Sequence, residues 1–457
     1  MSVTSFSRLG SANSYDNALR NLQNRQTSLS NLQENLTSGK KITSASDDPT
    51  GAAQAERAMN RIARISTDQR ALEAQKNSIA AAEGTLGDIT DALQNFRELV
   101  VSAGNGSHTA AERTTIAVQL SGLRDQVLTL ANTKDSNGLP LFAALGSALK
   151  PFVGPQSTAP DYTFDGLPGQ SASGSYAIPF TLDGESAFMN QPGRDAVFNV
   201  AVGNTATSDK AIPTTRGLVT DNIVVTNNAT VATTAAAAQA DLVSPADYPT
   251  YTVAFSNVTA NPVTGMSTVD YTITEIPPVS AGPFVTTTSA PYKTGEATKI
   301  AIAGIPGLSF NITGTPPVTD KASGAVVIGS PANGDTITIT PRVSVFSVLD
   351  TAIADIGSAK NANAANQAIA QALHNIDTGM ARVSAVRGQA GDLLGRADRI
   401  TATNEKRNIE QEGNRSRAED LDMIKGIADF QNQQTGYQAA LQSYAQVQKL
   451  SLFNYIG

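Results

Sequence analysis

The side chains best suited to acid–base or metal chemistry are few and scattered in this sequence. His108 and His374 are the only histidines, and neither has a second histidine at metal-ligand spacing. Cysteine is absent, which excludes disulfides and thiolate metal sites. Because His108 falls in a predicted loop between helices, a solvated histidine is the favoured interpretation. We therefore predict no metal site and no cofactor.

Asp47 and Asp48 are adjacent carboxylates that could act either in chemistry or in helix capping. Such a pair can carry out acid–base chemistry or bind a divalent ion, but Pro49 follows it directly. An aspartate before a proline is typical of a helix N-cap followed by the first helical residue, and this interpretation is favoured. Since residues 151–345 contain no histidine either, we predict that the chain is not an enzyme.

The composition excludes two further classes of partner. The 457 residues carry a net charge of -7 and only 16% charged residues, so no basic surface for nucleic acid is expected. No stretch approaches the roughly 20 apolar residues of a membrane span, and no membrane insertion is expected. The first residues lack a basic segment followed by an apolar one, so any export is expected to occur without a cleaved signal peptide.

Proline divides the chain into segments of different character. Nineteen of the 21 prolines lie within residues 151–341, so the regions before and after this stretch can form helices while the middle cannot. We predict an N-terminal assembly helix in residues 1–45 and a helical core built from 46–150 and 346–410. An inserted β-rich domain, with one or two subdomains, occupies 151–345, and a C-terminal assembly helix occupies 411–457.

A seven-residue spacing of apolar side chains runs through both ends. From Ile65 it continues without a break through Leu72, Ile79, Leu86, Leu93 and Val100. Six positions at this spacing indicate a coiled-coil-like seam, and a helix over residues 51–103 would be about 80 Å long. After the middle segment the same spacing returns at Ile369, Ile376, Val383, Ala390 and Ala397. Amphipathic helices of an ordinary bundle are the alternative.

The outermost helices have narrow apolar stripes on polar surfaces. Such helices are marginal in water by themselves, so each is expected to need a partner: the other terminus or another copy of the chain. The predicted assembly interface consists of Tyr15, Leu19, Leu22, Leu29, Leu36, Phe430, Tyr437, Leu441, Tyr444, Val447 and Leu450.

Local signals place the ends of several elements. Residues 104–106, Gly-Asn-Gly, are expected to end the long helix through left-handed backbone. Thr109 and Glu112 then predict a capping box. Residues 135–138 predict a turn into a short hairpin arm at 139–142. In the middle segment, residues 251–255, 269–274 and 336–340 alternate apolar and polar side chains and predict strands, while 232–240 is an alanine-rich helix or loop.

Residues 36–50 read LTSGKKITSASDDPT and resemble the LSSGKRINSASDDPA signature shared by flagellins and hook-associated proteins. The matching signature positions singled out are Gly39, Asp47, Asp48 and Pro49. The resemblance covers residues 1–145 and 345–457. Within this superfamily, SVFSVLD at 344–350 and QKLSLFNYI at 448–456 are most similar to hook-associated protein 3, the hook–filament junction family. Residues 137–143, NGLPLFA, are similar to that family's NGRYIFAG but have Leu139 and Pro140 in place of its Arg and Tyr.

The resemblance implies an α+β fold: long coiled-coil-like N- and C-terminal helices paired together, with an inserted β-rich outer domain. It also implies a structural role in the bacterial flagellum, joining hook to filament, with flagellin as the alternative. The implied partners are other copies of the chain in a ring, the first hook-associated protein, flagellin, an export chaperone and the type III export apparatus. The implied location is the extracellular flagellum. A coiled-coil adhesin or type III translocator, and an enzyme built on the insert, are weaker alternatives.

Overall fold

The computed structural model contains two compact units. It describes residues 4–456 except for 158–160, 171–176, 191–194, 209, 228, 230, 232, 234–249, 262, 264–265, 277–287, 294–295, 302–306, 316–317, 320–322, 324–325 and 328. Unit 1 consists of residues 1–71 and 399–457, and unit 2 of residues 72–398. Long helices and β-sheets occur together, which confirms the predicted α+β class.

Two long helices run antiparallel in unit 2. These are α2 (Pro49–Ala103) and α8 (Ala362–Glu419), which belong to unit 2 from Leu72 onward and up to Asp398. Three ion pairs show the direction: Lys76 with Asp398 (2.9 Å), Glu83 with Arg387 (2.7 Å) and Arg97 with Asp377 (2.7 Å). Ile65, the first predicted heptad position, is half-buried, and the predicted positions within unit 2 are buried: Leu72, Ile79, Leu86, Leu93, Val100, Ile369, Ile376, Val383, Ala390 and Ala397.

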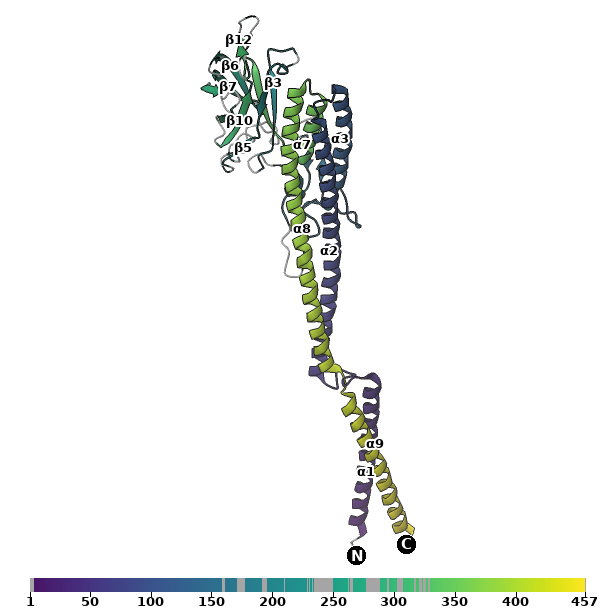
Figure 1. The fold of residues 1–457 in the computed structure, drawn as a ribbon. Helices are drawn as coiled ribbons and strands as arrows, with labels where there is room; N and C mark the ends of the chain where they lie inside the picture. Colours follow the sequence, from purple (N-terminus) through teal and green to yellow (C-terminus); the bar gives the residue numbers. More distant parts are fainter. Residues whose placement is uncertain are drawn as a thin grey trace. The chain divides into compact units, whose positions relative to one another are not determined.

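Two shorter helices complete the helical part of unit 2. Helix α3 (Ala110–Ala131) packs against α7 (Val345–Gly357), and Figure 1 shows both beside α2 and α8. The predicted capping box opens α3: the Thr109 hydroxyl accepts the Glu112 N–H, and the Glu112 carboxylate accepts the Thr109 N–H.

The end of α2 corrects one expectation. The helix does stop at Ala103, as residues 104–106 predict, but positive φ angles are recorded at six described glycines, and Gly104 and Gly106 are not among them. The chain instead leaves the helix through short turns, in which the Gly104 N–H bonds the Val101 carbonyl and Asn105 accepts the Ser107 N–H. The turn after the helix is thus stabilised by the Asn105 side chain and not by a left-handed backbone conformation.

The turn at residues 135–138 is present. Gly138 has φ of 80°, and Lys134 pairs with Pro140 in a single antiparallel bridge. A bridge of one pair is the whole of the predicted hairpin, and its two hydrogen bonds run from the Asp135 N–H to the Leu139 carbonyl and from the Leu141 N–H to the Thr133 carbonyl.

An aromatic cluster fixes the first part of the middle segment against α7. It involves β1 (Phe152–Val153), β2 (Thr163–Phe164) and α4 (Gly184–Phe188). Phe346 of α7 lies 5.5 Å from Phe152 and 5.8 Å from Phe188, between ring centroids. At its edge the Tyr162 hydroxyl donates to Asp350, which also pairs with Arg124, and burial together with Asp350 raises the pKa of Tyr162.

The remaining strands form two larger sheets. One has the order β3-β13-β6-β7-β8, from β3 (Phe198–Asn204), β6 (Thr250–Asn261), β7 (Met266–Ile276), β8 (Thr288–Lys293) and β13 (Asp335–Pro341). The other contains β4 (Leu218–Thr220), β10 (Leu308–Gly314) and β5 (Val224–Val225), with β9 (Thr298–Ala301) also paired to β10. A separate pair joins β11 (Val318–Thr319) to β12 (Val326–Val327).

The three strands predicted from alternation are present as β6, β7 and β13. In β13 the side chains of Ile337 and Ile339 are fully buried and their neighbours are half-buried, as a one-sided strand requires. The two larger sheets share one apolar core, which joins Ile273 and Ile337 to Phe310 and Ile312. The alanine-rich segment 232–240 falls, except for Thr233, outside the described residues.

A ladder of amide side chains fastens these sheets to α8. Asn363, Gln367, Gln371 and Asn375 recur every four residues on one face of the helix. Each donates to backbone oxygens of the strand region, such as Arg216 for Asn363 (2.9 Å) and Phe198 for Asn375 (2.9 Å). The strands therefore dock on the helix through polar contacts, and Figure 1 shows them beside α8.

Unit 1 contains the two terminal helices and the adjoining ends of α2 and α8. Helices α1 (Thr4–Ser38) and α9 (Met423–Ile456) pack along each other, as Figure 1 shows. In residues 1–15 and 447–457 no side chain is described.

Candidate assembly interface

The histidines do not form a chemical site. His108 lies 3.7 Å from Glu112 in the α3 cap, and His374 is half-buried on α8, where burial lowers its pKa although Asp377 acts in the opposite direction. Within the described ranges there is no group of three or more His, Asp or Glu side chains that could hold a metal ion. None of the described helices is long and apolar enough to cross a membrane.

The signature segment 36–50 joins the two termini of the chain in unit 1. Gly39 has φ of +69°, a left-handed conformation that ends α1 and that side chains other than glycine rarely adopt. The chain then pairs with the link between α8 and α9: the Lys41 N–H donates to the Glu419 carbonyl (2.8 Å), and the Leu421 N–H donates to the Gly39 carbonyl (2.9 Å). Lys40 also forms an ion pair with the Glu419 carboxylate.

The three remaining signature residues build the turn into α2. One carboxylate oxygen of Asp47 accepts the N–H groups of Thr43 and Ser44, at 3.1 and 2.8 Å. These hydrogen bonds lower the pKa of Asp47. Asp48 accepts the Thr50 and Gly51 N–H groups at 3.0 Å, and Pro49 is the first residue of α2. Both carboxylates are thus engaged by backbone donors at the helix start, the geometry expected of a cap.

The predicted interface positions on α1 and α9 differ in burial. On α1, Leu22 is buried, Leu29 and Leu36 are half-buried, and Leu19 is exposed. On α9, the half-buried positions are Phe430, Tyr437 and Tyr444, whereas Leu441 is exposed. Only the helical backbone of Tyr15, Val447 and Leu450 is described, so these three side chains lie outside the described part.

Pairing of α1 with α9 leaves apolar surface uncovered. Met423, Ile424, Ile427 and Leu441 of α9 are 45, 85, 46 and 42% exposed. Ile427 and Leu441 are two heptads apart with Gln434 between them, so these two uncovered side chains lie on the same side of α9. A stripe of this kind on a paired helix is typical of a surface that packs against a further helix.

Sequence reasoning missed the residues that let the helices approach each other. A Cβ atom added at Gly426 would lie 2.9 Å from Leu421 and 3.2 Å from Leu36, and one at Gly436 would lie 2.6 Å from Arg25. Ile42, the one large apolar side chain of the turn after Gly39, is buried. The signal was available for the glycines, because an isolated glycine inside a helical pattern indicates close packing.

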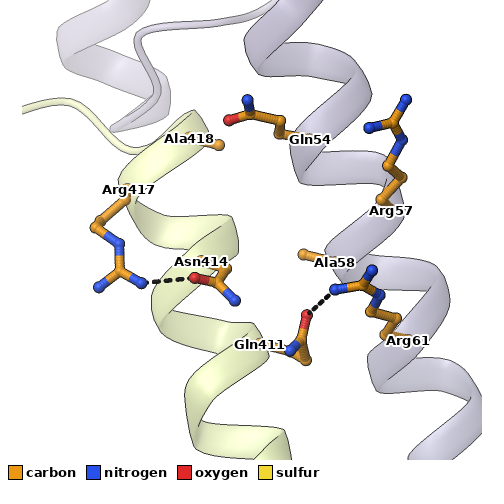
Figure 2. Close-up of a pocket in the computed structure, with 8 residues that line it drawn as sticks. All are labelled: Gln54, Arg57, Ala58, Arg61, Gln411, Asn414, Arg417 and Ala418. Carbon is orange, nitrogen blue, oxygen red and sulfur yellow. Dashed lines mark hydrogen bonds between the residues drawn. The ribbon is translucent and has the colours of Figure 1, made fainter.

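A cleft lined by arginines lies between the start of α2 and the end of α8, within unit 1. Its volume is about 340 Å³, and Figure 2 shows that Arg57 and Arg61 project from α2 and Arg417 from α8. Arg61 donates to Gln411 (3.4 Å) and Arg417 to Asn414 (2.6 Å). Among the residues that the structure describes, no carboxylate pairs with these three guanidinium groups.

The comparisons with known proteins confirm the resemblance found in the signature. Residues 11–146 match the bacterial flagellin N-terminal helical region. Flagellar hook-associated protein 3 of Salmonella typhimurium is 32% identical over 145 residues, which are 32% of this chain and 46% of that protein. The chain is also 36% identical over 123 residues to the flagellar filament core protein flaB2 of Brachyspira hyodysenteriae, covering 27% of this chain and 43% of that protein. The chain thus spans less than half the length of these curated relatives.

A solved structure shows the same fold over a larger part of the chain. Flagellar hook associated protein-3 from Legionella pneumophila aligns with 78% of this chain and 97% of its own, with a TM-score of 0.53 and 23% identity. Long paired terminal helices with an inserted β-rich part are therefore a fold shared with a flagellar hook-associated protein. The paired-helix architecture predicted from the heptads is confirmed in this way.

Proposed function

We propose that this chain, whose N-terminal helical region is that of the flagellin and hook-associated protein superfamily, is a structural subunit of the bacterial flagellum that joins the hook to the filament. The observation that carries the proposal is the stripe of exposed apolar side chains on α9, which remains after α9 has paired with α1. A monomer gains nothing from such a stripe, whereas helices of neighbouring subunits can cover it in a polymer.

Burial of this surface favours assembly. Burial of one large apolar side chain contributes about 1.5–3 kcal/mol, so covering Met423, Ile424, Ile427 and Leu441 contributes several kcal/mol for each subunit. Repetition of the contact around a ring adds to the stability of the whole assembly. In this proposal the predicted interface on α1 and α9 mediates assembly, the signature segment holds the two helices together, and the chain has no catalytic role.

The proposed partners follow from a position between hook and filament. They are other copies of the chain, the first hook-associated protein on one side and flagellin on the other. Export through the flagellar type III apparatus with the help of a chaperone, without cleavage of a signal peptide, is part of the same proposal. The extracellular flagellum is the proposed location.

Flagellin is the second candidate, because filament core proteins match this chain at comparable identity and over a comparable length. The phenotype of a strain lacking the gene distinguishes a junction protein from a flagellin. Loss of a junction protein leaves hooks intact and releases flagellin into the medium, and the wild-type gene restores filaments. Loss of a flagellin leaves hooks with no flagellin to release. Normal filaments in the deletion strain would contradict both functions.

A further inference from the structure

The arginine cleft of unit 1 arises where the heptad seam loses its apolar side chains. Continuing the spacing of seven from Ile65 toward the start of α2 gives Ala58, and continuing it from Ala397 along α8 gives Asn404, Gln411 and Ala418. Small and polar residues at seam positions weaken a coiled coil, because they bury little apolar surface. The space that a pair of leucines would fill is the cleft, of about 340 Å³.

The described part of the chain offers no opposite charge to the three arginines at this cleft. Arg57, Arg61 and Arg417 are all exposed, and their described hydrogen bonds reach only amide oxygens. Figure 2 shows Arg61 reaching across the gap toward Gln411, with Arg57 on the outer side of α2 and Arg417 on the outer side of α8. Three like charges around one opening repel each other, and carboxylates that enter it remove this repulsion and form bidentate hydrogen bonds.

Exposed carboxylates without a described partner form one face of α2 in unit 2. Asp88, Asp91 and Glu98 are spaced at three and seven residues, which places them on the same side of the helix. Asp88 and Asp91 are about 4.5 Å apart along the axis, close to the roughly 6 Å between Arg57 and Arg61, so two ion pairs can form together.

The charges of the two units support the same pairing. Unit 1 has 16 Lys and Arg against 13 Asp and Glu, a net charge of +3, whereas unit 2 has 17 against 27, a net charge of -10. Because Arg57 and Asp88 belong to one helix, a single copy cannot bring them together. The carboxylates must therefore come from another molecule.

We propose that the arginine cleft binds the acidic face of α2, residues Asp88, Asp91 and Glu98, in a second copy of this chain. This inference rests on the proposed structural function and names one contact through which the assembly forms. We take the copies to follow one another head to tail, so that the contact is heterologous and repeats from copy to copy, as a ring or an open chain of subunits requires.

Paired cysteines test the contact directly, because the natural chain contains none. Gln54 lines the cleft and Asn95 lies on the acidic face, so the full-length variant Gln54→Cys with Asn95→Cys keeps every charge. Expressed in a strain lacking the gene, it is expected to give a ladder of disulfide-linked dimers and larger oligomers in isolated flagella. Asn60→Cys with Asn95→Cys is the matched control and is expected to stay monomeric, because Asn60 is exposed on α2 but does not line the cleft.

Charge reversal in the Gln54→Cys, Asn95→Cys chain measures the electrostatic contribution to the contact between copies. Arg57→Glu with Arg61→Glu is expected to lower the cross-linked fraction by about tenfold or more, since it places carboxylates against carboxylates. Adding Asp88→Arg with Asp91→Arg to that chain is expected to restore the cross-links. Circular dichroism melts show whether each variant folds, and Arg64→Glu is a control for charge alone.

Three results would overturn the inference: flagella that contain the Gln54→Cys, Asn95→Cys chain only as monomer, equal cross-linking of the Asn60→Cys control, or cross-links to a different protein only. Failure of the proposed function has another signature, because the deletion strain would then carry normal filaments.

Discussion

Replacing Gln367 with leucine tests how the β-rich part is held on α8. Gln367 and Thr220 are 3% and 2% exposed, so their contact is shielded from water. The Gln367 amide oxygen accepts the Thr220 N–H at 3.1 Å, and its nitrogen donates to the Thr220 hydroxyl at 2.5 Å. Leucine has a similar size but offers neither a donor nor an acceptor, so Gln367→Leu leaves the Thr220 groups without partners.

The expected loss can be worked out from these two hydrogen bonds. A buried polar group without a partner costs about 1–3 kcal/mol, and the hydroxyl can rotate toward another acceptor while the backbone N–H cannot. Burial of the leucine side chain offsets part of the loss. We expect the free energy of local opening at β4 to fall by about 2–4 kcal/mol, which corresponds to roughly 30- to 1,000-fold faster amide exchange.

Hydrogen exchange of the full-length chain, followed by mass spectrometry, measures this opening at residues 218–220 and along α8. Asn366→Leu is the matched control, since Asn366 is the neighbouring residue and is exposed. Its exchange is expected to match the wild-type protein. Unchanged exchange at Thr220 in Gln367→Leu, or an equal acceleration in the control, would refute the view that the amide ladder holds the sheets on the helix.

Three further predictions concern the termini and the histidines. The variants Leu22→Asp and Tyr444→Asp are expected to block incorporation into flagella, since a carboxylate in an apolar seam costs several kcal/mol. The melting temperature of unit 2 is expected to stay unchanged. Normal incorporation, seen by electron microscopy, would contradict the predicted assembly interface. In the free monomer, residues up to about 41 and beyond about 417 are expected to exchange rapidly, because each terminal helix needs partners; strong protection in a verified monomer would refute this. Burial lowers the pKa of His374, so the neutral form is favoured in the folded protein and the free energy of unfolding falls as pH drops through about 6.5. The variant His374→Ala is expected to assemble normally and to lose this pH dependence in calorimetric melts. A failure of this variant to assemble would reopen a chemical role for the histidine.

The helical half of the fold was readable from the sequence because its determinants are local and periodic. A seven-residue spacing places Leu72, Ile79 and Leu86 on one side of a helix, independently of the rest of the chain. These three side chains are buried. Asp48 and Thr109 cap their helices through donors only two or three residues away. The hydrogen bonds of Asp47 are also local, whereas Gly39 accepts the Leu421 N–H from the other end of the chain and was singled out by the resemblance of the signature.

In the insert, local sequence patterns predict strands but not how the strands are arranged. Alternation placed strands β6, β7 and β13, but not their order, because the neighbours of β13 are β3 and β6, more than 70 residues earlier in the chain. The amide ladder on α8 has the spacing of a helix face, yet polar residues at that spacing ordinarily indicate solvent. Its partners are backbone atoms of strands about 150 residues away, and no local pattern encodes them.

The sequence by itself determined which segments are helical, where they are capped and which heptad positions are apolar. The tertiary structure decided which of those apolar positions are covered: Leu22 is buried while Leu19, three residues earlier, is exposed. It also brought Arg57 and Arg61 to Arg417, from opposite ends of the chain. Burial and charge clustering depend on which surfaces meet, and that depends on the whole packing of a chain whose local patterns specify only the elements themselves.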